Sequence, residues 1–226
     1  MSAMAATAPT PPPVIRAPDP LDRTLGLRER KKIRTRIAIR RATFRLIAEQ
    51  GWDATTIEQI ADAAEVSPST VFRYFPAKED IVLTDEYDPA VVAALRARPA
   101  DEDPLTSLRI VLADAVAAVA EHEPEATRQR RRLLTEVPAL RARMTGSLAE
   151  TSRVLAAALA ARAGRDPGDL EIRVLTAAVT GALREALVHW AECGDRQQDL
   201  AALVHRTLDL LESGLRTGGH GGGAPA

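Results

Sequence analysis

Three helical patterns joined by short connections lie between Thr35 and Ile81, and this stretch constrains the fold of the chain more than any other. From Arg28 to Gln50, apolar residues recur mostly every three or four positions, which is the spacing of one helix face. Gly51 ends this first pattern, because glycine tolerates the backbone conformation that closes a helix. Two short helices that follow a longer one predict a helix-turn-helix unit, whose second helix enters the major groove of DNA.

Capping residues set the starts of the two short helices. Thr56 followed by Gln59 is typical of a capping box, and the pair one residue earlier is a second possibility. Ser67 is expected to cap the third helix, with Pro68 at its first position, where no N–H is needed. The helix-turn-helix unit is therefore specified by side chains only three residues apart.

The third helix has two faces. Val71, Phe72 and Phe75 are expected to pack inward. The side chains that remain available to a partner are Ser69, Thr70, Arg73 and Tyr74.

This order of residues resembles the DNA-binding domain of the tetracycline-repressor (TetR) family of transcriptional regulators. The resemblance covers about fifty residues without a gap, from Thr35-Arg36 to Lys78-Glu79. The matching residues are Thr35, Arg36, Ile39, Ala42, Leu46, Ile47, Ala48, Glu49, Gly51, Thr55, Thr56, Ile57, Ile60, Ala61, Ala64, Val66, Ser67, Thr70, Val71, Tyr74, Phe75, Lys78 and Glu79. One departure is Phe72, where the family often has Tyr, so a phosphate contact through that hydroxyl is absent here.

The resemblance implies a set of DNA contacts. The candidates are Arg36, Thr56, Ser67, Ser69, Thr70, Arg73, Tyr74 and Lys78. Thr56 and Lys78 match family positions that hold the DNA backbone. Arg73 is the best candidate for a guanine contact, and Thr70 for a thymine methyl or a phosphate.

Charge is unevenly distributed although the formal net charge of the chain is only −1. Between Arg28 and Gln50, nine basic residues stand against two glutamates, a balance of +7. From Gly51 to Ile81 the balance is −4. A basic run is often a solvated face, but beside a helix-turn-helix it favours a phosphate-binding edge.

The whole chain is predicted to be all-α, with two domains between disordered ends. Residues 1–27 form a Pro-, Ala- and Thr-rich leader, and residues 217–226 a Gly-rich tail. Residues 28–81 form the DNA-binding domain and residues 82–216 a helical domain. Its expected helices run from Lys78 to a break at Asp88-Pro89, then over 105–121, 124–137, 138–163, from Asp166-Pro167 to 191, and 197–215.

The second domain resembles the helical ligand-binding and dimerisation domain of the same family. Val137 to Leu140, followed later by an Asp-Pro turn, is similar to a C-terminal subtype common among actinobacterial-type regulators. In the family the last two long helices form a four-helix dimer interface. The residues expected there are Leu183, Leu187, Val204, Leu208 and Leu211; an intramolecular core is the alternative use of the same stripes.

A ligand pocket is expected in this domain. Arg130 shares a helix face with Leu134, and it either snorkels, pairs with a carboxylate, or meets a ligand anion. Thr176, Thr180 and Arg184 are polar positions in an otherwise apolar helix and are also candidate pocket residues. Aromatic residues are scarce, which disfavours a cation cage and favours an aliphatic ligand with an acidic end, such as an acyl thioester.

Several classes of protein are excluded or disfavoured. No run of about 18 apolar residues exists to span a membrane. The N-terminus lacks the apolar core of a signal peptide, so a cytoplasmic protein is expected. Cys193 is the single cysteine, and the histidines lack metal spacing. No phosphate loop, nucleophile elbow or paired-histidine motif indicates an enzyme, and no cofactor or metal is expected.

The sequence therefore predicts a homodimeric transcriptional regulator that binds a palindromic DNA operator and responds to a small molecule. A repressor that the ligand releases from DNA is the main hypothesis. The alternatives are an activator of the same family and a helical adaptor that binds protein instead of DNA.

Overall fold

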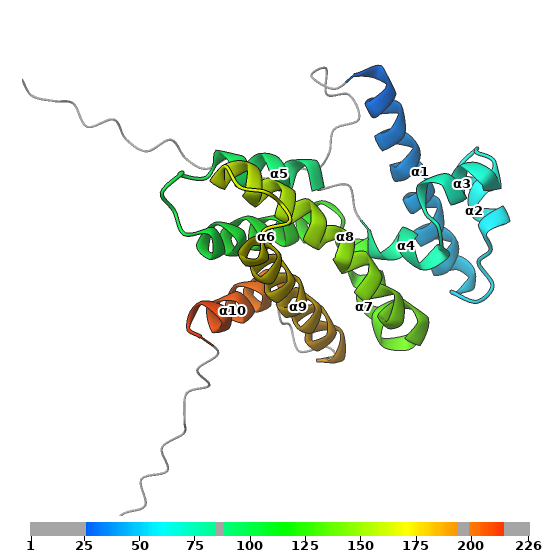
Figure 1. Ribbon diagram of the computed structural model, residues 1–226. Coiled ribbons are helices and arrows are strands. Elements are labelled where there is room, and N and C mark those ends of the chain that lie inside the picture. Colours follow the sequence, from blue (N-terminus) through cyan, green and yellow to red (C-terminus); the bar gives the residue numbers. More distant parts are fainter. Residues whose placement is uncertain (1–25, 85–87, 194–198, 215–226) are drawn as a thin grey trace, which may run out of the picture.

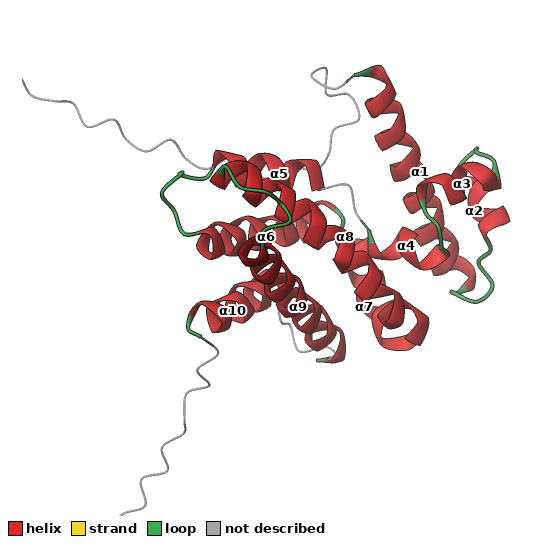
Figure 2. Cartoon of the chain, viewed as in Figure 1, coloured by secondary structure: helices red, strands yellow, loops and turns green. Residues whose placement is uncertain are grey.

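The computed structural model describes residues 26–84, 88–193 and 199–214, and within them every regular element is an α-helix (Figures 1 and 2). The helices are α1 (Leu27–Gln50), α2 (Ile57–Ala63), α3 (Pro68–Tyr74), α4 (Lys78–Leu83), α5 (Asp88–Ala97), α6 (Pro104–His122), α7 (Pro124–Glu136), α8 (Pro138–Ala163), α9 (Leu170–Glu192) and α10 (Leu200–Glu212). The predicted all-α class is confirmed. The predicted leader and tail lie outside the described residues, except that Gly26 caps α1 and Leu27 begins it.

The first four helices form a small unit at one end of the molecule, and α5 to α10 form a larger bundle beside it (Figure 1). A buried cluster of Ile39, Ile60, Val71, Phe75 and Ile81 joins α1 to α4. These side chains come from all four helices, so the unit has a core of its own.

A second, larger cluster fills the bundle of α5 to α10. It also includes Phe44 and Ile47 on α1 and Val82 on α4. On α4, Ile81 therefore packs into the small core and Val82 into the large one, and both are fully buried. The short helix α4 belongs to both parts of the fold.

Several helix boundaries differ from the sequence prediction; the last helix, expected over 197–215, spans Leu200–Glu212. The helix expected to begin at Asp166-Pro167 begins at Leu170, because the Asp166 carboxylate accepts a hydrogen bond from Gly168 N at 2.6 Å and forms a turn instead of a cap. The helix that starts at Lys78 ends at Leu83, ahead of the expected break, and Thr84 is extended.

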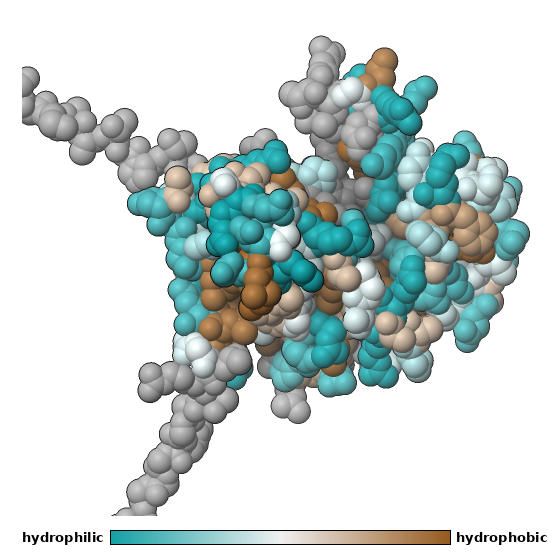
Figure 3. All heavy atoms as spheres, in the orientation of Figure 1, coloured by the Kyte–Doolittle hydropathy of each residue, from teal (hydrophilic) through white to brown (hydrophobic). Residues whose placement is uncertain are grey.

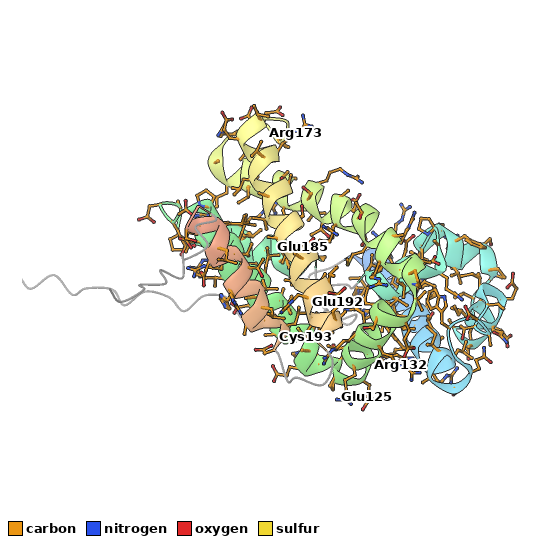
Figure 4. All side chains as sticks on the ribbon, turned by 90° about the horizontal axis from the view of Figure 1, so that it is seen from below. Glu125, Arg132, Arg173, Glu185, Glu192 and Cys193 are labelled. Carbon is orange, nitrogen blue, oxygen red and sulfur yellow. The ribbon has the colours of Figure 1, made fainter. Side chains whose placement is uncertain are left out.

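Long helices of the bundle bury alanine-rich faces. α8 buries Ala156, Ala158 and Ala160, and α9 packs against both α8 and α10. Figure 4 shows α9 running from Arg173 near its start to Glu192 and Cys193 at its end, beside α10. No described helix is long and apolar enough to cross a lipid bilayer.

Candidate functional site

Helices α2 and α3 begin at the caps that the sequence predicts. Ser67 Oγ accepts from Thr70 N at 3.2 Å, and Pro68 occupies the first turn. Thr56 Oγ1 accepts from Gln59 N, and Gln59 Oε1 accepts from Thr56 N, so the capping box of α2 is complete. Local hydrogen bonds therefore fix the start of each short helix independently of tertiary packing.

Polar side chains cover the outer face of α3. Ser67, Ser69 and Arg73 are exposed, and Ser67 Oγ lies 2.9 Å from both Ser69 Oγ and Thr70 Oγ1. The Arg73 guanidinium lies 3.4 Å from Thr70 Oγ1 and 5.2 Å from the Tyr74 ring centroid. The exposed serine and arginine side chains have the donors and acceptors that base edges and phosphates need.

Arg36 and Lys78 lie differently from the expectation that they project toward DNA. Arg36 donates to Tyr74 O at 3.2 Å and stacks over the Phe75 ring at 4.4 Å, so it holds the end of α3 against α1. Lys78 Nζ donates to Trp52 O and Thr55 O, both at 2.8 Å, and lies 4.1 Å from the Trp52 ring centroid. Burial lowers the pKa of the Lys78 ammonium from its usual value. Both side chains position the helix-turn-helix unit.

Phe72 is also placed differently from the prediction. It was expected to pack inward with Val71 and Phe75, but its side chain is 50% exposed, whereas Val71 and Phe75 are buried. The turn of α3 is the reason, since Phe72 follows Val71 by about 100° around the helix and leaves the buried face.

A basic surface lies along α1. Lys31, Arg34, Arg41 and Arg45 are exposed, and their spacings of three, seven and four residues place them on one side of the helix. Arg40 is different: it is buried and pairs with Glu123 at 2.7 Å, where α6 meets α7. These exposed basic side chains make one side of α1 positively charged.

A cavity of about 210 Å³ lies inside the bundle. Most of its wall is apolar, with side chains from seven helices: Leu83, Val91, Leu112, Val116, Leu134, Met144, Leu148, Leu155, Leu183, Leu187, Trp190 and Val204. Its polar lining groups are Thr84, Thr127, Arg130, Ser147, Glu150 and Thr151. A mostly apolar cavity with a few polar groups is the usual form of a small-molecule site.

The predicted pocket residues divide into two groups. Arg130 and Leu134 line the cavity. Thr176 and Thr180 do not, because their hydroxyls bond back to Ile172 O and Thr176 O at 2.9 and 2.8 Å on their own helix. Arg184 is exposed and pairs with Glu185, so its assignment to the pocket is wrong.

Polar links between described residues join the unit of α1 to α4 to the bundle that holds the cavity. Arg143 on α8 makes two hydrogen bonds to the Asp80 carboxylate, from Nε to Oδ1 and from Nη2 to Oδ2, both at 2.7 Å. This pairing raises the pKa of the Arg143 guanidinium. Arg130 Nε donates to Val82 O at 2.8 Å. Gln129 Nε2 donates to Phe44 O at 2.9 Å, and Arg40 pairs with Glu123.

Arg143 and Arg130 hold α4 near its two ends. Asp80 also accepts from Ala77 N at 3.1 Å, so one carboxylate caps α4 and binds α8. Val82 lies in the last turn, where carbonyls lack helical partners. Leu83 and Thr84, which follow it, line the cavity. The sequence shows Asp80 as a first-turn acid, but it carries no signal for a partner 63 residues away.

The residues predicted for the dimer interface lie mostly inside the single chain. Leu208 is fully buried and Val204 is 1% exposed. Leu183, Leu187 and Val204 line the cavity. Burial within one chain favours the intramolecular alternative for Leu183, Val204 and Leu208, and Leu187 is partly buried beside them. Leu211 alone of the five borders an exposed apolar hollow.

That hollow lies on the outer side of α9 and α10. Leu170 and Val174 on α9 are 69% and 59% exposed, and Leu210 on α10 is 42% exposed. Ala178 and Gly181 continue the α9 face at helical spacing, and a Cβ added at Gly181 would meet open space. Figure 3 shows apolar atoms gathered on the surface over these two helices. We call Leu170, Val174, Ala178, Gly181 and Leu211 the outer apolar face.

Comparison with known proteins gives two family matches along the chain. Residues 39–84 match the family described as bacterial regulatory proteins, tetR family, and residues 102–216 match the family described as MftR C-terminal domain. The HTH-type transcriptional regulator TcmR of Streptomyces glaucescens is 36% identical over 196 residues, which cover 83% of this chain and 86% of TcmR.

Solved structures with a similar arrangement include two regulators named FadR. The fatty acid degradation regulator of Bacillus halodurans has a TM-score of 0.49 and 26% identity, over 80% of this chain and 96% of that one. The Thermus thermophilus repressor, solved in complex with lauroyl-CoA, has a TM-score of 0.48 and 25% identity, over 84% and 99%.

Proposed function

Because this chain belongs to the TetR family of helix-turn-helix transcriptional regulators, we propose that it is a repressor that binds a palindromic operator as a homodimer and leaves the operator when a small molecule fills the cavity. The observation that supports the ligand response is that α4 contributes to the cores of both parts of the fold. Ile81 belongs to the core of the DNA-binding unit, Val82 belongs to the core of the bundle, and Leu83 lines the cavity.

The DNA contacts in this proposal come from the exposed face of α3 and its surroundings. Ser67, Ser69 and Arg73 face the major groove, with Thr70 and Tyr74 at its sides. Thr56 donates its hydroxyl proton to a phosphate, since that oxygen already accepts from Gln59 N. The exposed basic side chains of α1 attract the DNA phosphates, and this attraction depends on salt but not on the DNA sequence.

The dimer in this proposal forms through the outer apolar face of α9 and α10. Contiguous apolar surface of this kind is rare on monomers and indicates a covered interface. The small residues Ala178 and Gly181 allow the two copies of α9 to approach closely, and two-fold symmetry would present two recognition helices to a palindrome.

The ligand in this proposal is an amphiphile with an apolar body and an acidic group, such as a fatty acyl compound. The apolar wall supports the body, and the Arg130 guanidinium in the lining supports the acidic group. The Thr127 hydroxyl oxygen is buried without a hydrogen-bond partner beside the cavity, so it is a further polar group for the ligand. A cavity of about 210 Å³ suits a compact ligand or the end of a longer chain.

Release from DNA requires that the ligand bind better to a state that does not fit the operator. A ligand pressing on Leu83, Thr84 and Arg130 acts directly on the end of α4. Since α4 follows the recognition helix and is tied to α8 by Asp80 and Arg143, its displacement would change the separation of the two recognition helices.

Binding-site selection with the full-length protein, followed by fluorescence anisotropy on the selected duplex and on a random one, tests the proposal. A palindromic motif is expected, with affinity that falls steeply as salt is added. An adaptor that binds only protein would select no motif and would show no salt-dependent binding to the random duplex.

A further inference from the structure

Phe72 has an exposed aromatic ring on the recognition helix, where the sequence predicts a buried one. Its side chain is 50% exposed, and it belongs to neither of the two apolar clusters. Phe75, one helical turn away, is 1% exposed and fills the core of the DNA-binding unit. The core is therefore complete without Phe72.

Exposure of large apolar side chains is confined to few places in the described part of the chain. Leu170 and Val174 lie on the outer apolar face, Leu210 lies on α10, and Leu27 begins α1. Phe72 is the remaining one, and it lies in the helix-turn-helix unit. Figure 3 shows apolar atoms on the otherwise polar surface at the α2–α3 end of the molecule.

The neighbours of Phe72 on α3 define which surface it shares. Ser69 precedes it by three residues and Arg73 follows it directly, and both are exposed. Residues three apart lie on the same side of a helix, so the ring stands beside the polar groups proposed to read base edges. A side chain on this surface meets the floor or the wall of the major groove.

We propose that Phe72 is a sequence-reading residue whose ring packs against the 5-methyl group of a thymine in each operator half-site. This inference rests on the proposed DNA-binding function. Within the major groove, the thymine methyl is the apolar feature of an unmodified base pair. A phenyl ring has no group to donate to a phosphate, so an exposed Phe at this position gains free energy by covering that methyl group.

Replacement of thymine by deoxyuridine tests the contact, because it removes only the methyl group. Each thymine of the selected operator is replaced in turn, at symmetric positions of both half-sites, and the dissociation constant is measured at fixed salt. For the wild-type protein, loss of the methyl group at one thymine position should raise the dissociation constant about fourfold when one half-site is changed and about fifteenfold when both are changed. These factors correspond to one buried methyl group per half-site.

Two variants make the assignment specific. Phe72→Ala should bind the operator more weakly and should be indifferent to uridine at that pair, whereas Phe72→Leu should keep part of the sensitivity. Arg73→Ala serves as the matched control: it should bind more weakly yet lose the same factor on uridine substitution. Because Phe72 is half exposed, circular dichroism melting should show a fold as stable as that of the wild type.

Three results would overturn the inference. The first is a wild-type protein for which no thymine pair is sensitive to loss of the methyl group, although it binds its operator. The second is a Phe72→Ala protein as sensitive as the wild type. The third is a wild-type protein that selects no DNA motif, which would remove the proposed function and this inference with it.

Discussion

The DNA-binding unit and the cavity differ in the sequence separation of the residues that shape them. Thr56 and Gln59 cap α2, and Ser67 and Thr70 cap α3, at a separation of three residues in both pairs. The cavity instead gathers side chains from Leu83 to Val204. The polar reading surface is thus set by local hydrogen bonds, whereas the ligand site exists only when the whole bundle has packed.

Charges introduced on the buried face and on the outer face of α9 and α10 should have different consequences. The loss of folding or of dimerisation is the largest effect we expect. Leu208 is fully buried, so Leu208→Glu buries an unpaired charge at a cost of several kcal/mol and should give unfolded or insoluble protein. Val174 is 59% exposed, so Val174→Glu should leave a folded monomer with much weaker operator binding.

Circular dichroism and analytical ultracentrifugation measure the two outcomes. Arg173→Glu, which exchanges one exposed charge for another on α9, is the control for added negative charge. A folded, dimeric Leu208→Glu protein would show that α10 does not pack on α6 and α9 as described. A dimeric Val174→Glu protein would place the interface elsewhere.

Lys78→Ala tests whether the DNA-binding unit also depends on contacts between separate segments. The change leaves Trp52 O and Thr55 O without the ammonium donor and should cost about 1.5–3 kcal/mol of stability, as for hydrogen bonds to charged groups. Thermal unfolding gives this loss. The dependence of operator affinity on salt should stay unchanged, and a slope smaller by about one unit would instead restore Lys78 as a phosphate contact.

Arg73→Ala should leave the fold intact, because the side chain is exposed on the surface that α3 presents. Operator affinity should fall by about 1–3 kcal/mol, with relaxed preference at one symmetric pair of positions. Binding-site selection with the variant gives the readout. Recovery of the unchanged motif would reduce Arg73 to a backbone contact or a surface charge.

Glu102 offers a smaller effect, dependent on pH, in the bundle alone. Hydrogen bonds from Arg98 and Ser107 lower its pKa from 4.5 to about 2. The carboxylate therefore stabilises the folded state above pH 4.5, and that contribution is lost as the pH falls from 4.5 toward 2. Thermal melts should show Glu102→Gln less stable than wild type at neutral pH, with the gap closing in acid. A gap independent of pH would contradict this assignment.

The same contrast explains how much of the molecule the sequence predicts. Helix α1, the capping box at Thr56 and the cap at Ser67 follow from periodicity and spacing of a few residues. The error at Phe72 is also local, since Phe72 lies at the edge of the apolar stripe, about 100° from Val71, and the pattern does not show how wide the buried face is. Local patterns predict which helix forms better than which way each side chain points.

The cavity and its link to α4 lie beyond sequence patterns for a physical reason. An apolar stripe shows that Val204 and Leu208 are covered, but not whether their own chain or a second copy covers them. Arg143 is one of four arginines on α8, and only the tertiary fold brings its guanidinium to Asp80. Thr176 and Thr180 appear as pocket residues from polarity alone, whereas their hydroxyls satisfy their own backbone.

Coupling between cavity and operator is the central claim, and one thermodynamic cycle tests it most directly. Operator affinity is measured by anisotropy with and without a saturating medium-chain fatty acid or acyl thioester, for the wild type and for Arg143→Gln. Arg132→Gln, which removes an exposed arginine paired with Glu136 on α7, is the matched control.

The account predicts that the ligand weakens operator binding by about 5–150-fold in the wild type and in the control. In Arg143→Gln, which loses the pair with Asp80, the ligand should still bind but the factor should shrink toward one. A ligand that binds the cavity of the wild-type protein and leaves operator affinity unchanged would contradict the account.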